Sequence, residues 1–182
     1  MGQSELNAAS LQLHFADETA LKAAAGGAAR AWQAESRDAI LTGLRGDLGS
    51  GKTTWVRGML EGLGYADRVP SPTYTLLEHY ALPGLDVVHV DLYRVGSASM
   101  GPADVTAELE ALGLRDWLAR ERCWLLVEWP ERAAELLRRC DVVIHFELGA
   151  GPDTREVDLT PFTARGASLV GALQQVPESS SS

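Results

Sequence analysis

Cysteine and histidine are sparse in this chain, and their spacing excludes the usual metal and redox motifs. The 182 residues include two cysteines, Cys123 and Cys140, which lie too far apart to form a CxxC pair. The four histidines show neither HxxxH spacing nor a cysteine-linked ligand pattern. We therefore expect two ordinary thiols rather than a zinc site or a redox pair.

Long apolar runs are also missing. No run approaches the roughly 20 residues that a membrane-spanning helix needs. The first ten residues, MGQSELNAAS, lack the basic and apolar segments of a secretory signal. From these absences we expect a cytoplasmic protein that does not bind membranes.

Basic residues are fewer than acidic ones, 16 against 25. The formal net charge is −9, and the arginines at 115, 120 and 122 alternate with Asp116 and Glu121 instead of forming a basic stripe. Affinity for nucleic acid depends largely on clustered Lys and Arg that displace counterions from phosphates. The chain is therefore not expected to bind nucleic acid strongly by itself.

The composition that is present, 46% hydrophobic and 23% charged, is that of an ordinary globular protein of one domain. Apolar runs bounded by Gly, Pro or Asp alternate with helical patterns, which predicts an α/β P-loop fold, a mostly parallel sheet with helices on both faces. The expected strands span 39–45, 74–80, 86–90, 123–127, 142–146 and 156–159; the expected helices span 17–33, 55–63, 106–121 and 131–139. Residues 74–90 are close enough to form an antiparallel hairpin.

The boundaries of the domain follow from the same patterns. We expect a flexible N-terminus over residues 1–10, a P-loop ATPase domain over 11–165 and a flexible tail over 166–182, which ends in four serines. Residues 97–104 are predicted to form a loop. Gly64 is well placed to cap the helix that follows the glycine-rich segment.

That glycine-rich segment carries the strongest chemical signal. It reads Gly46-Asp47-Leu48-Gly49-Ser50-Gly51-Lys52-Thr53 and fits the phosphate-binding pattern GxxxxGK[ST], with an apolar strand before it and an amphipathic helix after it. Small residues let backbone N–H groups turn toward phosphate oxygens, and the helix N-terminus adds a positive dipole end. We predict that the nucleotide contacts are Gly49, Ser50, Gly51, Lys52, Thr53 and Thr54.

Lysine usage supports this assignment. The chain has two lysines, Lys22 and Lys52, against fourteen arginines, so Lys has been kept where a compact ammonium suits a phosphate group. Lys52 is predicted to reach the β and γ phosphates, and the Thr53 hydroxyl is predicted to ligate Mg²⁺.

Two predicted strands end in an acidic residue, as a P-loop site requires. Asp91 follows one apolar run and Glu128 follows another, and ligands of such sheets bind outside the carboxyl ends of the strands. Either carboxylate could hold Mg²⁺ directly or through water. The segment at 71–74, Ser-Pro-Thr-Tyr, lies where nucleotide switches place a hydroxyl near the γ-phosphate, although the sequence alone slightly favours a simple proline turn.

Other nucleotide enzymes are distinguished by motifs that this chain lacks. Its one asparagine, Asn7, lies in no NKxD context, which argues against a GTPase, and no LSGGQ-type signature is present. A small-molecule kinase stays open at this stage, because Arg94, Arg115 or Arg120 could bind a second substrate.

Taken together, five motifs in order resemble the TsaE (YjeE) family over about residues 17–158. They are GDLGSGKTT from Gly46, SPTYTL from Ser71, DLYR from Asp91, EALGL from Glu110 and VEWPE from Val127. The resemblance implies a Mg²⁺-dependent ATPase that acts with a TsaB–TsaD complex in making threonylcarbamoyladenosine in tRNA.

The same resemblance implies roles for individual residues. Lys52 would hold phosphate, Asp91 would complete the catalytic site, and Thr53 and Glu128 would ligate Mg²⁺. Thr73 would act as a switch residue, and weaker candidates for nucleotide contact are Glu18, Glu131 and Arg155. Two departures from the family pattern are a longer segment at 96–105 and Ser50 in place of a common alanine.

Overall fold

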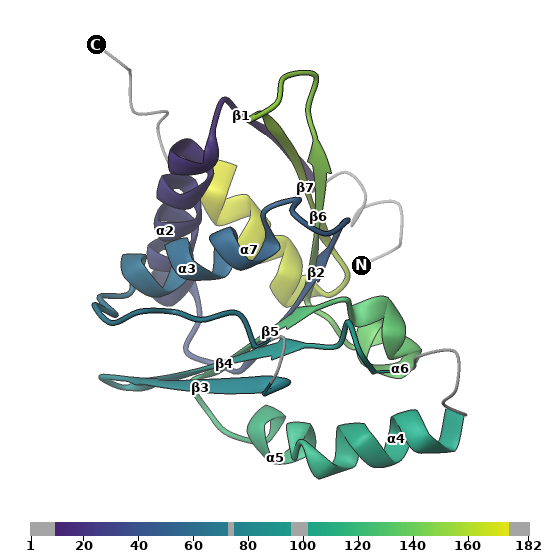
Figure 1. Cartoon of the computed structure of the whole chain (residues 1–182). Helices are drawn as coiled ribbons and strands as arrows, with labels where there is room; N and C mark the ends of the chain where they lie inside the picture. Colours follow the sequence, from purple (N-terminus) through teal and green to yellow (C-terminus); the bar gives the residue numbers. More distant parts are fainter. Residues whose placement is uncertain (1–9, 73–74, 96–101, 175–182) are drawn as a thin grey trace.

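Short apolar runs pair into one sheet in the computed structural model, which describes residues 10–72, 75–95 and 102–174 (Figure 1). The seven strands of this sheet are β1 (Leu11–Phe15), β2 (Ile40–Arg45), β3 (Leu77–Leu82), β4 (Leu85–Asp91), β5 (Cys123–Glu128), β6 (Val142–Leu148) and β7 (Arg155–Pro161). Six of them correspond to predicted strands, and β1 was not predicted. The sequence of β1, LQLHF, alternates apolar and polar residues, and it ends at the buried Phe15; this alternation is a strand signal that could have identified β1.

The sheet has the order β1-β7-β6-β2-β5-β4-β3. The central pairings β6–β2, β2–β5 and β5–β4 are parallel, as predicted for a P-loop fold. The outer pairings are antiparallel, and β3–β4 is the hairpin that the short connection allowed. The carboxyl ends of β2, β4 and β5 therefore meet at one edge of the sheet.

Helices cover both faces of the sheet (Figure 1). One face carries α2 (Glu18–Glu35), α3 (Lys52–Gly62) and α7 (Ala164–Gln174); the other carries α4 (Pro102–Ala111), α5 (Leu114–Leu118), the short η1 (Pro130–Arg132) and α6 (Ala134–Arg138). Buried side chains form a separate core on each face, here called the α3-face core and the α5-face core. None of the described helices is long and apolar enough to cross a membrane.

Helix ends follow the capping rules. Asp17 caps α2 by accepting a hydrogen bond from the N–H of Ala20 at 2.8 Å. After α3 the chain turns at Gly64, whose φ is 89°, and the N–H of Tyr65 donates to the Leu60 carbonyl at 2.9 Å. This is the glycine cap that the sequence predicted for the end of α3.

Helices α2 and α3 pack with their backbones in contact. A Cβ atom added at Gly58 would overlap the carbonyl oxygen of Lys22, and one added at Gly62 would overlap that of Gly26. No side chain fits between the two helices at these points. The start of α3, which carries the phosphate-binding loop, is thereby fixed against α2.

The predicted flexible tail is wrong for residues 166–174, which belong to α7. Leu169 and Val170 are fully buried in the α3-face core, and the indole N–H of Trp32 donates to the Leu169 carbonyl at 3.0 Å. Residues 175–182 and 1–9, also predicted to be flexible, lie outside the described residues.

Three other predicted segments differ in detail. The loop predicted at 97–104 includes the first residues of α4, and residues 96–101 lie outside the described ones. The single helix predicted over 106–121 is split at Gly113, whose φ of 63° ends α4 before α5 begins. The helix predicted over 131–139 is likewise divided into η1 and α6.

Candidate functional site

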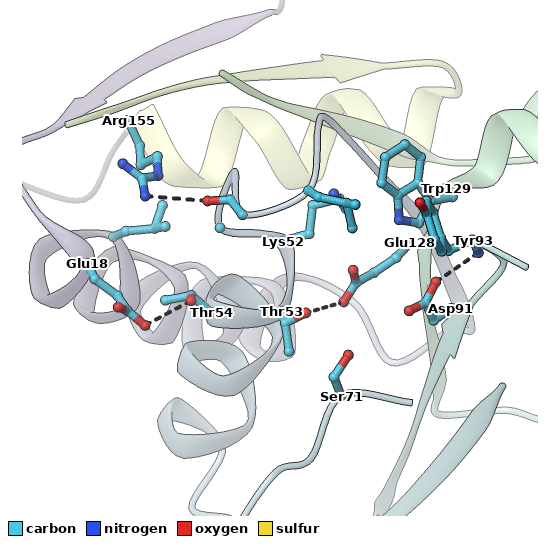
Figure 2. Close-up of a pocket in the computed structure, with 14 residues that line it drawn as sticks. Glu18, Lys52, Thr53, Thr54, Ser71, Asp91, Tyr93, Glu128, Trp129 and Arg155 are labelled. Atoms are coloured by element: carbon cyan, nitrogen blue, oxygen red, sulfur yellow. Dashed lines mark hydrogen bonds between the residues drawn. The ribbon is translucent and has the colours of Figure 1, made fainter. Parts of the chain in front are cut away.

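The loop of residues 46–53 joins β2 to α3 and borders a cavity of about 250 Å³ (Figure 2). Its shape depends on glycine: Gly46 has a φ of 136° and Gly51 a φ of 112°. A Cβ atom at Gly46 would overlap the Phe146 carbonyl oxygen, and one at Gly51 would lie 2.7 Å from a methyl group of Leu21. Because α3 begins at Lys52, the positive end of its dipole opens onto the cavity.

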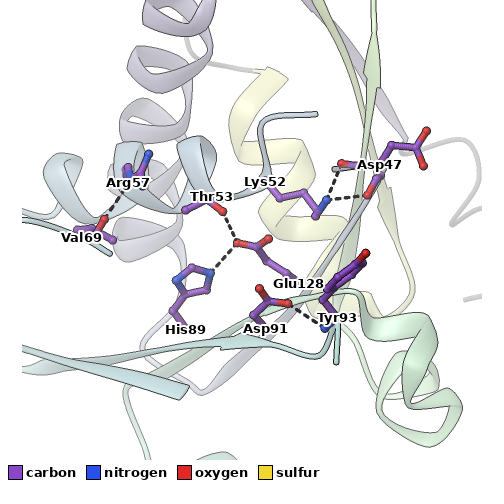
Figure 3. A network of polar contacts seen from close by, with 10 residues as sticks. Asp47, Lys52, Thr53, Arg57, Val69, His89, Asp91, Tyr93 and Glu128 are labelled. Atoms are coloured by element: carbon purple, nitrogen blue, oxygen red, sulfur yellow. Dashed lines mark hydrogen bonds and ion pairs between the residues drawn. The ribbon is translucent and has the colours of Figure 1, made fainter. Parts of the chain in front are cut away.

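Lys52 is buried and bonds to its own loop. Its ammonium donates to the carbonyl oxygens of Gly46 at 2.6 Å and Asp47 at 2.8 Å (Figure 3). It also lies 4.2 Å from the centre of the Trp129 ring. Burial lowers the pKa of this ammonium, while the Glu128 carboxylate and other acids nearby oppose that shift. The loop thus presents a positive charge in a partly dry environment.

A hydrogen-bonded chain runs from the start of α3 to β4 and β5. The Thr53 hydroxyl donates to Oε1 of Glu128 at 2.8 Å, and Nε2 of His89 lies 2.8 Å from the same oxygen. Burial by itself would raise the pKa of Glu128, but the hydrogen-bonding and electrostatic interactions with His89, the hydrogen bond from Thr53 and the charge of Lys52 outweigh it and lower that pKa. Glu128 is therefore held as a carboxylate.

Asp91 lies beside Glu128 because β4 and β5 are parallel neighbours in which these two residues are paired. The backbone N–H of Tyr93 donates to Oδ1 of Asp91 at 2.8 Å. Within the described part of the chain, no group of three or more His, Cys, Asp or Glu side chains could hold a metal ion. A hard cation here would need oxygen ligands from phosphate or water in addition to these carboxylates.

The opposite end of the cavity is formed by α2, α3 and β7 (Figure 2). The Thr54 hydroxyl donates to Oε1 of Glu18 at 3.0 Å, and the Arg155 guanidinium lies 3.4 Å from the carbonyl oxygen of Gly49. The cavity thus extends from Glu18 and Arg155, past Lys52 and Thr53, to the acidic pair at the strand ends.

Three predicted site residues need separate comment. The Ser50 side chain is buried and its hydroxyl has no hydrogen-bond partner among the described residues. Glu131 is absent from the described residues that line the cavity; its carboxylate lies 3.6 Å from Nε of Arg45. Thr73 lies outside the described residues, whereas Ser71 two positions earlier does line the cavity.

The displacement of Glu131 has a local cause. Trp129 adopts a left-handed backbone conformation with a φ of 58°, and Pro130 then starts η1, so the chain turns away directly after Glu128. A bulky residue in this conformation stores about 1–3 kcal/mol of strain. The turn places the Trp129 ring between Lys52 and Tyr93, whose ring centroid is 5.1 Å away.

Sequence reasoning did not identify His89 and Tyr93 as site residues. Tyr93 lies in the DLYR motif and lines the cavity. His89 is a polar residue between Val88 and Val90 in an otherwise apolar run, two positions before Asp91. In a strand this spacing puts both side chains on the same face, which is a signal that could have identified it.

Comparison with known proteins places this site in a family. The family model described as threonylcarbamoyl adenosine biosynthesis protein TsaE matches residues 15–157. The chain is 37% identical over 134 residues to the tRNA threonylcarbamoyladenosine biosynthesis protein TsaE of Haemophilus influenzae, covering 74% of this chain and 78% of that protein. The protein of the same name from Bacillus subtilis is 38% identical over 123 residues, or 66% of this chain and 68% of that one.

A solved structure agrees with these matches. The crystal structure of Bacillus subtilis YdiB superposes with a TM-score of 0.70 and 28% sequence identity, covering 91% of this chain and 94% of that chain. The family model spans the phosphate-binding loop and both strand-end acids. This chain therefore belongs to the TsaE family.

Proposed function

We propose that this protein binds ATP with Mg²⁺ and hydrolyses it in support of a TsaB–TsaD-type complex that forms threonylcarbamoyladenosine in tRNA. The observation that carries the proposal is the 2.8 Å hydrogen bond from the Thr53 hydroxyl to Glu128, next to the buried ammonium of Lys52. A phosphate-binding loop, a hydroxyl and an acid in this arrangement are what Mg²⁺-dependent phosphoryl transfer needs.

The triphosphate would lie along the loop. Backbone N–H groups at residues 49–54 and the ammonium of Lys52 would bind its oxygens, and the buried hydroxyl of Ser50 lies in the same loop. Lys52 has one ammonium hydrogen beyond the two donated to Gly46 and Asp47. The nucleoside end would lie toward Glu18 and Arg155, at the far end of the cavity.

The residues at the other end fit a magnesium ion. Thr53, Glu128 and Asp91 present oxygen atoms, which are the ligands that Mg²⁺ prefers, and Mg²⁺ usually keeps several waters or phosphate ligands as well. When bound, the ion would neutralise charge that develops between the β and γ phosphates. Thr73 stays a proposed switch residue.

Hydrolysis would be mainly an electrostatic effect. Lys52 would stabilise negative charge on the phosphates, and Asp91 would orient a water molecule for attack on the γ-phosphate. The Trp129 ring packs against Lys52 and shields it from solvent on that side. Charge–charge interactions of Lys52 are therefore stronger than they would be in water.

The acidic character of the chain supports a proposal in which partner proteins, and not this chain, bind the tRNA. With a formal net charge of −9, the protein is poorly suited to bind tRNA on its own. In this proposal the partner complex holds the tRNA, and ATP turnover rises when the complex binds.

The experiment is a release assay with γ-labelled ATP, run with and without the partner complex. We expect slow turnover alone and faster turnover with the complex. Lys52→Ala should lower the rate by about 10²–10³, because it removes a preorganised positive group. The matched control is Lys22→Ala: Lys22 forms a 2.6 Å ion pair with Glu61 and is 37% exposed, so its loss should leave turnover unchanged.

The same assay separates the alternatives. Label that accumulates on a small acceptor instead of in inorganic phosphate would identify a kinase. Full turnover without partners and no response to them would contradict the supporting role, and near-normal turnover in Lys52→Ala would contradict the assigned site.

A further inference from the structure

We propose that His89 is a positioning residue: its imidazole donates Nε2–H to Oε1 of Glu128 and so fixes the orientation of that carboxylate toward the magnesium site. The inference rests on the proposed Mg²⁺–ATP function and adds to it a residue that touches neither nucleotide nor metal. His89 is fully buried, and its Nε2 is 2.8 Å from the carboxylate oxygen (Figure 3).

Strand register brings the two side chains together. His89 on β4 is paired with Leu126 on β5, and Glu128 is two residues further along the same strand. Side chains two apart in a strand share a face, so His89, Asp91 and Glu128 all point to the face covered by α3. The imidazole thus contacts Glu128 without lining the cavity itself.

The hydrogen-bond inventory determines which nitrogen carries the hydrogen. Glu128 is ionised and can only accept, so Nε2 of His89 must be the donor. Nδ1 is buried and has no hydrogen-bond partner among the described residues. The hydrogen that the contact with Glu128 requires is therefore the one on Nε2.

This arrangement assigns separate tasks to the two carboxylate oxygens. Oε1 accepts hydrogen bonds from both Thr53 and His89. If Mg²⁺ binds, Oε2 would be the oxygen available to the ion or to one of its waters. Since the Thr53 hydroxyl gives its hydrogen to Oε1, its own lone pairs are also available to the metal.

If His89 were replaced, the hydrogen bond from Thr53 would be the described contact left to orient Oε1 of Glu128. The carboxylate could then rotate about its last side-chain bond. Changing a group that orients a metal ligand typically lowers metal affinity by about 10–100-fold. The effect should be specific to the metal, because His89 does not line the cavity in which the nucleotide would bind.

The test compares ATP affinity with Mg²⁺ and with EDTA by calorimetry, in the wild type, His89→Gln and His89→Leu. The ratio of the two affinities reports the contribution of the metal. A glutamine amide can donate from about the position of Nε2, so His89→Gln should keep a near-normal ratio. His89→Leu fills the space but cannot donate, and its ratio should fall about 10–100-fold, with the affinity in EDTA unchanged.

His79→Leu is the matched control. His79 lies on the edge strand β3, is bonded to Asp86 at 2.6 Å, and contacts Trp117 on the opposite face of the sheet. The ratio of the ATP affinities with Mg²⁺ and with EDTA should be the same in His79→Leu as in the wild type. A second measurement, nitrogen NMR of the wild-type imidazole, should show a hydrogen on Nε2, and it does not depend on any variant folding.

The outcomes separate this inference from the proposed function. A wild-type protein whose ATP affinity does not respond to Mg²⁺ would refute the proposed function. If the wild type responds, then a normal ratio in folded His89→Leu, or an imidazole without a hydrogen on Nε2, would refute the role of His89 alone.

Discussion

The two faces of the sheet are built differently. The α3-face core contains large rings in edge-to-face contact, with centroids 6.2 Å apart for Trp32–Trp124 and 5.8 Å for Trp55–Phe146. Its helices have 18, 11 and 11 residues. The α5-face core consists mainly of Val and Leu with two cysteines, beneath helices of 10, 5 and 5 residues.

The candidate site belongs to the first of these faces. Lys52 and Thr53 start α3, and the strand-end acids point to the face that α3 covers. Aromatic pairs of this geometry add about 0.5–1.5 kcal/mol each beyond the burial of their area. The core with the larger aromatic contacts therefore lies on the face that carries the candidate site. Catalysis there would need side chains positioned to within a fraction of an ångström.

Cavity-forming substitutions on the two faces should show the largest contrast. Leu169→Ala on α7 removes a fully buried side chain next to Trp32 and should destabilise toward the upper part of the usual ~2–5 kcal/mol. Leu136→Ala on the five-residue α6 should lie near the lower end, about 2 kcal/mol, because a short helix can relax into the space. Urea unfolding measures the free energy of unfolding of both variants. Equal losses would show that the two faces of the sheet do not differ in this respect.

Glycine substitutions should give a smaller contrast with opposite signs. Gly58→Ala would force a methyl group into the Lys22 carbonyl and should destabilise by about 1–3 kcal/mol despite the better helix propensity of alanine. At Gly171 on α7 an added Cβ meets nothing within 4 Å, so Gly171→Ala should stabilise by about 0.4–1 kcal/mol. Thermal melting measures the stability change of each variant. Stabilisation by Gly58→Ala would show that α2 and α3 can move apart.

Thiol reactivity should give the smallest effect and the finest test. Burial raises the pKa of Cys123 to about 11 and that of Cys140 to about 12, so both should stay unmodified by a thiol reagent in the native protein near pH 8. As pH rises toward these values the thiolate fraction grows, and labelling should increase only there or on unfolding. Val170→Cys places a thiol in the α3-face core for comparison. Faster labelling of this thiol than of the native cysteines would show that the α3-face core opens more readily than the α5-face core.

Local patterns predicted much of the fold. The apolar runs before Gly46 and before the two acids are strands because they are short, apolar and bounded by turn residues. The alternation of apolar and polar residues in β1 is also a strand signal, although a short one of five residues, and the pairing of β1 with β7 depends on residues far away in the sequence. The tail was misjudged because its serines and glycines obscure Leu169 and Val170, whose burial depends on distant partners such as Trp32.

The candidate site divides in the same way. The loop of residues 46–53 and the two strand-end acids follow from spacing, and the structure brings Lys52, Thr53, Asp91 and Glu128 to one cavity. The contact of His89 with Glu128 depends on strand register, and the turn of Glu131 toward Arg45 depends on the backbone at Trp129. Thr73 stays a prediction, and the chemical role of every site residue is a matter for the experiments above.

The backbone contact between α2 and α3 limits how this protein can move. Shear motions of packed helices rely on side chains that change rotamer as the helices slide. Around Gly58 and Gly62 there is no such layer, so sliding α3 along α2 would drive main-chain atoms into one another. If the proposed ATP turnover changes the conformation of this protein, we expect the change to occur in segments other than the contact between α2 and α3.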